Sequence, residues 1–161
     1  MYSKTVDPYA IAFPAPAFTL RSPDFAPGAP LPTSAYASGG DRAPALTWDD
    51  LPAGTQSLVL TAFDPDAPIP GGFWHLTVKD IPPAGAPSDG VALANSLGVT
   101  GYSGVNPPPG TGTHRLFLCA TALSVPVLEL PPAAGQALLH VLMIPHTLGR
   151  AILVGTSTPA S

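Results

Sequence analysis

The fold of this 161-residue chain is decided by a stretch that runs from Ser57-Leu58-Val59-Leu60-Thr61-Ala62-Phe63 into Asp64-Pro65-Asp66-Ala67-Pro68. The first seven residues form a nearly continuous apolar run, which is typical of a strand with both faces covered. In the next five, the proline between the two carboxylates has a fixed φ of about −65° and disfavours helix at the residue before it. We therefore expect a buried strand that ends in a stiff, acidic loop.

Further strands follow from the same kind of pattern. Phe73–Ile81 is rich in aromatic and β-branched residues and alternates loosely, so it indicates a second long strand. Proline and glycine interrupt almost every other segment, which favours short elements joined by turns. The fold class predicted is all-β, an antiparallel sandwich with one late α-helix and long irregular loops. The remaining expected elements are strands at 17–21, 46–48, 115–123 and 151–155, and a helix at 133–146 that begins after a proline pair and ends near a proline.

The length fits a single domain. We expect an N-terminal arm over residues 1–16, where three prolines forbid a long helix, and one domain over 17–158. Residues 82–114 read as a long irregular segment with one short turn of helix near 91–97. A loop of that length in a compact domain is usually functional.

Charge and cysteine content exclude several classes of protein. Only 10% of the residues are charged, the formal net charge is −4, and the six Lys and Arg residues form no run. Proteins that bind nucleic acid carry a basic patch, and helices that lie on a membrane surface are rich in lysine and arginine. The sequence therefore disfavours both classes. The single cysteine, Cys119, lies in an apolar run and is expected to be a buried structural thiol.

The cellular location is predicted from two sequence features, a secretory signal and a membrane-spanning segment, neither of which is recognised. Residues 1–13 contain no apolar run of the kind that a secretory signal needs. The longest apolar tract, 116–130, is interrupted by polar residues and is too short to span a bilayer. The expectation is a soluble cytoplasmic protein without a transmembrane segment.

The candidate site combines Asp64 or Asp66 with His75 and His114, each of which stands beside a strand end. A carboxylate close to a histidine favours the imidazolium, so we expect a raised histidine pKa and a pocket that can hold an anion. Purely structural roles for these residues remain open as alternatives to a binding site. The carboxylates could accept backbone N–H groups in an Asx-type turn, and either histidine could be a satisfied core residue.

Other chemistries fit less well. Gly101-Tyr102-Ser103-Gly104-Val105 lacks the final glycine of a nucleophile elbow, which disfavours a serine hydrolase. Two histidines and a carboxylate also match some iron and zinc sites, although the spacing is not the usual one. A metal-assisted or acid–base enzyme that uses His75, His114 and Asp66 is therefore the alternative to a binding protein. No cofactor is expected.

A family resemblance is carried by Asp64-Pro65-Asp66-Ala67-Pro68, by Gly72-Phe73-Trp74-His75, by Gly101-Tyr102-Ser103-Gly104 and by Gly110 to Arg115. In this order and spacing they resemble the phosphatidylethanolamine-binding protein family, in particular its bacterial branch of Raf-kinase-inhibitor-like proteins of the YbhB and YbcL type. The likeness covers roughly residues 17–156.

The resemblance implies a Greek-key sandwich with a small pocket for phosphate groups such as phosphoethanolamine. It implies that the histidines donate to the phosphate and that a backbone N–H near Gly104 adds a donor. It also implies a homodimer and inhibition of a kinase or a protease. The implied pocket residues are Asp64, Asp66, Pro68, His75, Gly104, Pro107 and His114.

Two departures from the family are visible. The family commonly has tyrosine after His-Arg, where this chain has Leu116, and it often has proline directly after the glycine at 104, where this chain has Val105-Asn106-Pro107. A pocket without the tyrosine hydroxyl could be weaker or vestigial, which leaves a scaffold protein as a third hypothesis.

Overall fold

The computed structural model describes residues 6–161, so residues 1–5 of the predicted arm lie outside the described residues. Most of the regular structure is β-strand. The strands are β1 (Thr19–Arg21), β2 (Thr47–Asp49), β3 (Ser57–Asp64), β4 (Phe73–Ile81), β5 (Val91–Ala92), β6 (His114–Leu123) and β7 (Thr147–Ser157). The helices are α1 (Gln136–Met143) and three 3₁₀ turns, η1 (Thr33–Ala35), η2 (Pro87–Asp89) and η3 (Ile144–His146).

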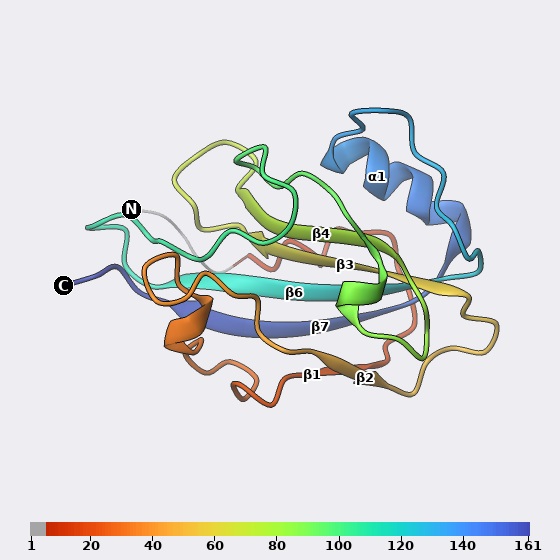
Figure 1. Ribbon diagram of the computed structural model, residues 1–161, viewed down its shortest axis with the longest axis horizontal. Coiled ribbons are helices and arrows are strands. Elements are labelled where there is room, and N and C mark those ends of the chain that lie inside the picture. Colours follow the sequence, from red (N-terminus) through yellow and green to blue (C-terminus); the bar gives the residue numbers. More distant parts are fainter. Residues whose placement is uncertain (1–5) are drawn as a thin grey trace.

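Five strands form one antiparallel sheet in the order β5-β4-β3-β6-β7, and β1 pairs with β2 in a smaller sheet. Strands β3, β4 and β5 are successive neighbours, and β6 returns over a long connection to pair with β3. That order is the Greek key. Figure 1 shows β1 and β2 along β7, with α1 on the opposite side of the molecule. The predicted all-β class with a single late α-helix is confirmed.

Two apolar clusters lie on the two faces of the large sheet. The main core joins Leu20 of β1 with Leu60 of β3 and Leu118 of β6. The second cluster packs Val59 of β3 against Leu139 of α1. Successive residues of β3 thus point into different clusters, which explains why its sequence is a continuous apolar run rather than an alternation.

The outer edge of β7 is covered by segments from the N-terminal part of the chain. The Arg150 N–H donates to the Pro16 carbonyl, and the Gly28 N–H donates to the Val154 carbonyl. The Leu31 N–H donates to Thr156, which returns a bond to the Ala29 carbonyl. Residues 6–16 also contact the large sheet, since the Tyr9 ring lies 5.8 Å from that of Phe117. The boundary between arm and domain after residue 16 stays a prediction.

Three expectations about elements need correction. No helix forms near 91–97, because the Asn95 side chain accepts the N–H groups of Leu97 and Val99 and folds this segment as a turn. Helix α1 begins at residue 136, after Gly135, rather than at 133. Strand β7 runs over 147–157, well beyond 151–155, because it pairs along the whole length of β6.

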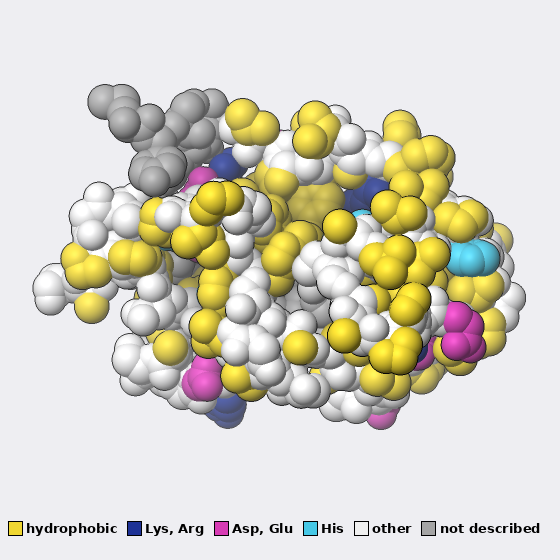
Figure 2. Space-filling view, turned by 90° about the horizontal axis from the view of Figure 1, so that it is seen from above, with side chains coloured by type: hydrophobic (Ala, Val, Ile, Leu, Met, Phe, Trp, Pro, Cys, Tyr) yellow, Lys and Arg dark blue, Asp and Glu magenta, His cyan; other side chains and the backbone are white. Residues whose placement is uncertain are grey.

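Cys119 is buried, as expected for a structural thiol, and burial raises its pKa to about 11. Within residues 6–161, no helix has the length and apolar character that crossing a bilayer requires. On the face drawn in Figure 2, charged side chains are few and scattered among hydrophobic and uncharged groups.

Candidate functional site

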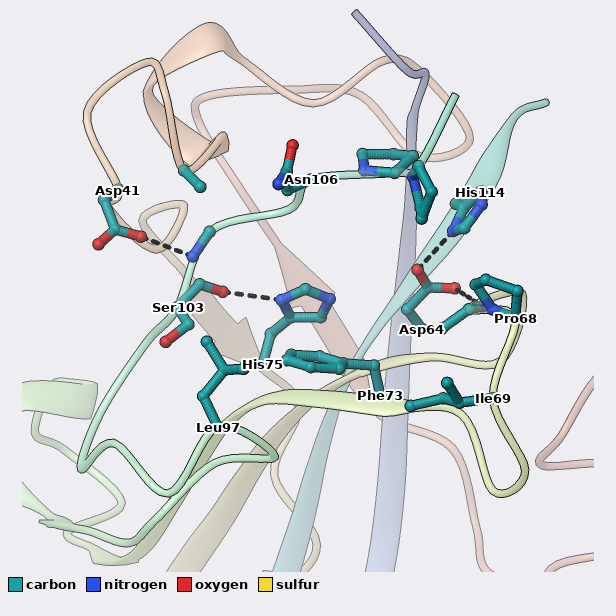
Figure 3. A pocket seen from close by; sticks show the side chains of 15 residues that line it. Asp41, Asp64, Pro68, Ile69, Phe73, His75, Leu97, Ser103, Asn106 and His114 are labelled. Atoms are coloured by element: carbon teal, nitrogen blue, oxygen red, sulfur yellow. Dashed lines mark hydrogen bonds and ion pairs between the residues drawn. The ribbon is translucent and has the colours of Figure 1, made fainter. Parts of the chain in front are cut away.

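A cavity of about 460 Å³ lies at the end of the large sheet where β3 ends and β4 and β6 begin. Antiparallel pairing brings these strand ends together, since Asp64 is opposite Phe73 and Phe63 is opposite Phe117. Six of the seven predicted site residues line it: Asp64, Pro68, His75, Gly104, Pro107 and His114. Figure 3 shows their arrangement around the cavity.

Asp64 fulfils both roles that its sequence motif suggested. One carboxylate oxygen, Oδ1, accepts the backbone N–H groups of Asp66 at 2.7 Å and Ala67 at 3.0 Å, which forms the Asx-type turn. The other oxygen, Oδ2, lies 2.7 Å from Nδ1 of His114. With 6% of its surface exposed, the carboxylate depends on these three donors to compensate for its burial.

His114 is held at both ring nitrogens. Nδ1 donates to Asp64, and Nε2 lies 2.7 Å from the Thr111 hydroxyl oxygen. That hydroxyl also donates to the Pro108 carbonyl at 2.7 Å. Both ring nitrogens of His114 thus have partners within the protein, so a phosphate would have to displace Thr111 to reach this ring. Donation from His114 to a phosphate stays a prediction.

His75 keeps one ring nitrogen for the cavity. Its Nδ1 donates to the Ser103 carbonyl at 2.7 Å, and its ring packs against Phe73 with centroids 4.5 Å apart. Figure 3 shows the other nitrogen directed toward Asp64 and His114. Burial lowers the pKa of His75 and outweighs the attraction of Asp64, so the predicted raised pKa is wrong for this histidine. With Nδ1 protonated, the neutral ring presents Nε2 as a hydrogen-bond acceptor.

Asp66 lies outside the cavity lining, contrary to the prediction. Its Oδ2 accepts the backbone N–H and the Nε–H of Arg115, both at 2.9 Å, and its Oδ1 accepts from Nη2 at 3.0 Å. Neighbouring residues of a strand point to opposite faces. His114 therefore faces the cavity and pairs with Asp64, while Arg115 faces the other side and pairs with Asp66.

Gly104 contributes close packing rather than a ligand donor. Its N–H already donates to Oδ1 of Asp41 at 2.6 Å, so the implied free donor at this residue is wrong. A Cβ at this position would lie 2.4 Å from the backbone nitrogen of Ala37. The absence of a side chain allows residues 36–37 to pair beside 104–105 and close one wall of the cavity.

The model of the phosphatidylethanolamine-binding protein family matches residues 21–158 of this chain. The chain belongs to the phosphatidylethanolamine-binding protein family. Among its relatives, YbhB of Escherichia coli K12 is 36% identical over 126 residues, which cover 70% of this chain and 79% of YbhB. LppC of Mycobacterium tuberculosis H37Rv, a candidate lipoprotein by name, is 39% identical over 159 residues, which cover 94% of this chain and 78% of LppC. The crystal structure of E. coli YbcL matches with a TM-score of 0.81 and 28% identity, covering 89% of this chain and 99% of YbcL.

The predicted resemblance to the phosphatidylethanolamine-binding protein family is thus confirmed. The position where the family commonly has tyrosine is filled by Leu116, which lies in the main core and does not line the cavity. The polar character of this family member's cavity therefore comes from other residues, in particular Asp64, His75 and Asp41.

Several lining residues carried no signal in the sequence. Asp41 stands in a glycine-rich loop far from the motif, and only the fold brings it to Gly104. Ser103 was noted as part of a failed hydrolase motif and of the family resemblance but not as a site residue, yet its carbonyl orients His75. Apolar walls complete the cavity, and they come from Phe73, Ile69, Leu97 and Pro108.

Metal ligation finds no support in this geometry. Within residues 6–161, no three His, Cys, Asp or Glu side chains are grouped to hold a metal ion. Both ring nitrogens of His114 also have partners within the protein, Thr111 and Asp64. Of the two carboxylates considered as ligands with His75 and His114, Asp66 lies with Arg115, whereas Asp64 lies in the cavity and pairs with His114.

Proposed function

We propose that this protein binds a small phosphate-type or other anionic ligand in the cavity at the ends of β3, β4 and β6, with His75 as the polar anchor. The observation that carries the proposal is the free Nε2 of His75, which faces a 460 Å³ cavity while every other histidine nitrogen there is occupied. The Asp64 carboxylate accepts hydrogen bonds from His114 and from the Asp66 and Ala67 N–H groups, so its charge repels an anion less than a free carboxylate would.

The lining suits a phosphate that bears a small organic group. A phosphate that carries a proton can donate it to Nε2 of neutral His75, and a fully ionised phosphate can accept from the same nitrogen once it is protonated. Phe73 and Leu97 offer apolar surface to the organic part, and the Asp41 carboxylate at the lining suits an ammonium group. O-phosphoethanolamine combines these three features.

The binding test is an NMR titration of the folded protein with inorganic phosphate and with O-phosphoethanolamine. We expect saturable shifts at His75, Ser103 and Gly104, and at least about tenfold weaker binding for His75→Gln, because a hydrogen bond to a charged partner is lost. His146→Gln, which changes a histidine outside the cavity, serves as the matched control and should bind normally. Equal affinity in His75→Gln, or shifts that map elsewhere, would reject the site.

Anion binding at His75 should also depend on pH in a defined direction. Burial lowers the pKa of this ring, so it is neutral near pH 7, and it must gain a proton to donate to an anion without protons. Affinity for sulfate, which does not titrate in this range, should therefore rise as pH falls from 8 to 5, by up to about tenfold per unit. Calorimetry at several pH values measures this. A flat profile in the native protein would contradict it, and His75→Gln should give a flat profile.

We further propose a cytoplasmic homodimer that inhibits or regulates a kinase or a protease. Support for these points comes from the family resemblance of the D-P-D-A-P and G-x-H-R motifs. Sedimentation velocity tests the dimer, and cell fractionation tests the location, for which the lipoprotein name of the relative LppC suggests membrane attachment as the competing result.

A further inference from the structure

A second cavity, of about 170 Å³, lies on the other face of the large sheet. Residues 9–13 form one wall, α1 and η3 form another, and the outward side chains of β6 and β7 form the floor. In the face drawn in Figure 2, a hollow with hydrophobic side chains in its depth has a Lys or Arg side chain and a His side chain beside it. None of the residues that line this cavity belongs to the His75 site.

Arg150 brings an unpaired positive charge to this cavity. It lies on β7 opposite Thr121, and within residues 6–161 its guanidinium has no hydrogen bond and no ion pair. Arg115 binds Asp66 and Arg21 binds Asp49, whereas Arg42 is exposed to solvent. No Asp or Glu lines the cavity. A partly buried guanidinium without an anion is a place where a carboxylate gains a bidentate partner.

The surroundings of Arg150 add apolar surface and no second charge. The hydroxyl of Tyr9 is buried and not exposed to the cavity, and burial raises its pKa, so it stays uncharged. His140 donates Nδ1–H to the Gln136 carbonyl, and burial lowers its pKa, so it adds no second positive charge. Phe13 and Val141 present exposed hydrophobic side chains at the rim.

We propose that this second cavity binds a small monocarboxylate with an apolar body, its carboxylate held by Arg150 and its body by Phe13, Val141 and Met143. The mostly apolar lining disfavours a dianion such as phosphate, which would lose more hydration than one guanidinium can replace. The volume suits a ligand of the size of benzoate or hexanoate. This site is independent of the anion site at His75.

The experiment is an NMR titration of the folded full chain with sodium benzoate, with benzamide as the uncharged analogue of the same shape. We expect saturable shifts at Tyr9, Thr121 and Arg150 with benzoate, and binding at least about tenfold weaker with benzamide. Arg150→Met, which keeps an apolar side chain but removes the charge, should weaken benzoate binding to the same degree. Arg21→Met, an exposed arginine outside the cavity, is the matched control and should bind as the native protein does.

The outcomes separate this site from the His75 site. His75→Gln should leave benzoate binding intact, and inorganic phosphate should not shift Tyr9 or Thr121. If benzoate produces no saturable shifts at these residues, binds no better than benzamide, or shifts only the His75 cavity, the proposal is wrong. The comparison of benzoate with benzamide uses the native protein, so the result does not depend on whether Arg150→Met folds.

Discussion

Asp64→Ala is expected to lower the free energy of unfolding by about 3–5 kcal/mol. The substitution removes the acceptor of the Asp66 and Ala67 N–H groups and of His114 Nδ1, and it leaves these donors buried without a partner. His114 is 1% exposed, so water cannot easily replace the carboxylate. Domains of this kind are stable by only about 5–15 kcal/mol in total, and urea unfolding should show the loss directly.

Asp89→Ala provides the matched control for Asp64→Ala. Asp89 also accepts a backbone N–H, from Ala86 at 2.8 Å, but it is solvent-exposed and has no histidine partner. Its loss should cost only about 1 kcal/mol, as for a turn or helix cap. Similar costs for the two variants would mean that the buried pair with His114 contributes little to the fold.

Gly104→Ala is expected to destabilise the protein by about 3 kcal/mol, although it adds only one methyl group. The new Cβ would lie 2.4 Å from the backbone nitrogen of Ala37 and 2.6 Å from the carbonyl carbon of Tyr36. Backbone cannot rotate away as a side chain can, so the two segments must separate. That separation weakens the bonds from Ala37 N–H to the Val105 carbonyl and from Val105 N–H to the Ala35 carbonyl, both 3.1 Å. Thermal and urea unfolding measure the effect.

Gly135→Ala tests whether this cost is specific to the position. A Cβ there would meet nothing within 4 Å, and φ is −83°, so neither a clash nor backbone strain arises. The residue precedes α1 as its N-cap, where alanine is less favourable than glycine, and the cost should stay at or below about 1 kcal/mol. An equal loss in both variants would show that the close approach at Gly104 is not the cause.

The sequence allowed the main strands and their meeting point to be predicted, because long apolar runs and flanking prolines are local signals. Strand β4 has the predicted bounds, 73–81. Convergence of Asp64, His75 and His114 followed from their common position at strand ends, which antiparallel pairing brings to one edge of the sheet.

The pairing of individual polar groups could not be predicted in the same way. Whether Asp64 or Asp66 contacts a histidine depends on which way each side chain faces. In the structure, Asp66 accepts hydrogen bonds from Arg115 instead. The Nε2 atom of His114 lies beside the Thr111 hydroxyl, which also bonds the Pro108 carbonyl, and no general pattern marks either residue as a partner. Asp41 reaches the cavity from a loop more than sixty residues from Gly104 in the chain.

The way in which the large sheet is bordered limits how two copies of the chain can associate. Its β5 border is only two residues long, and the β7 border already exchanges main-chain bonds with residues 16 and 28–31. Neither side therefore offers a long row of vacant amides and carbonyls to a second molecule. A dimer that forms through this sheet must therefore use its faces or the loops around it, and strand addition at β7 would first require the N-terminal segments to detach.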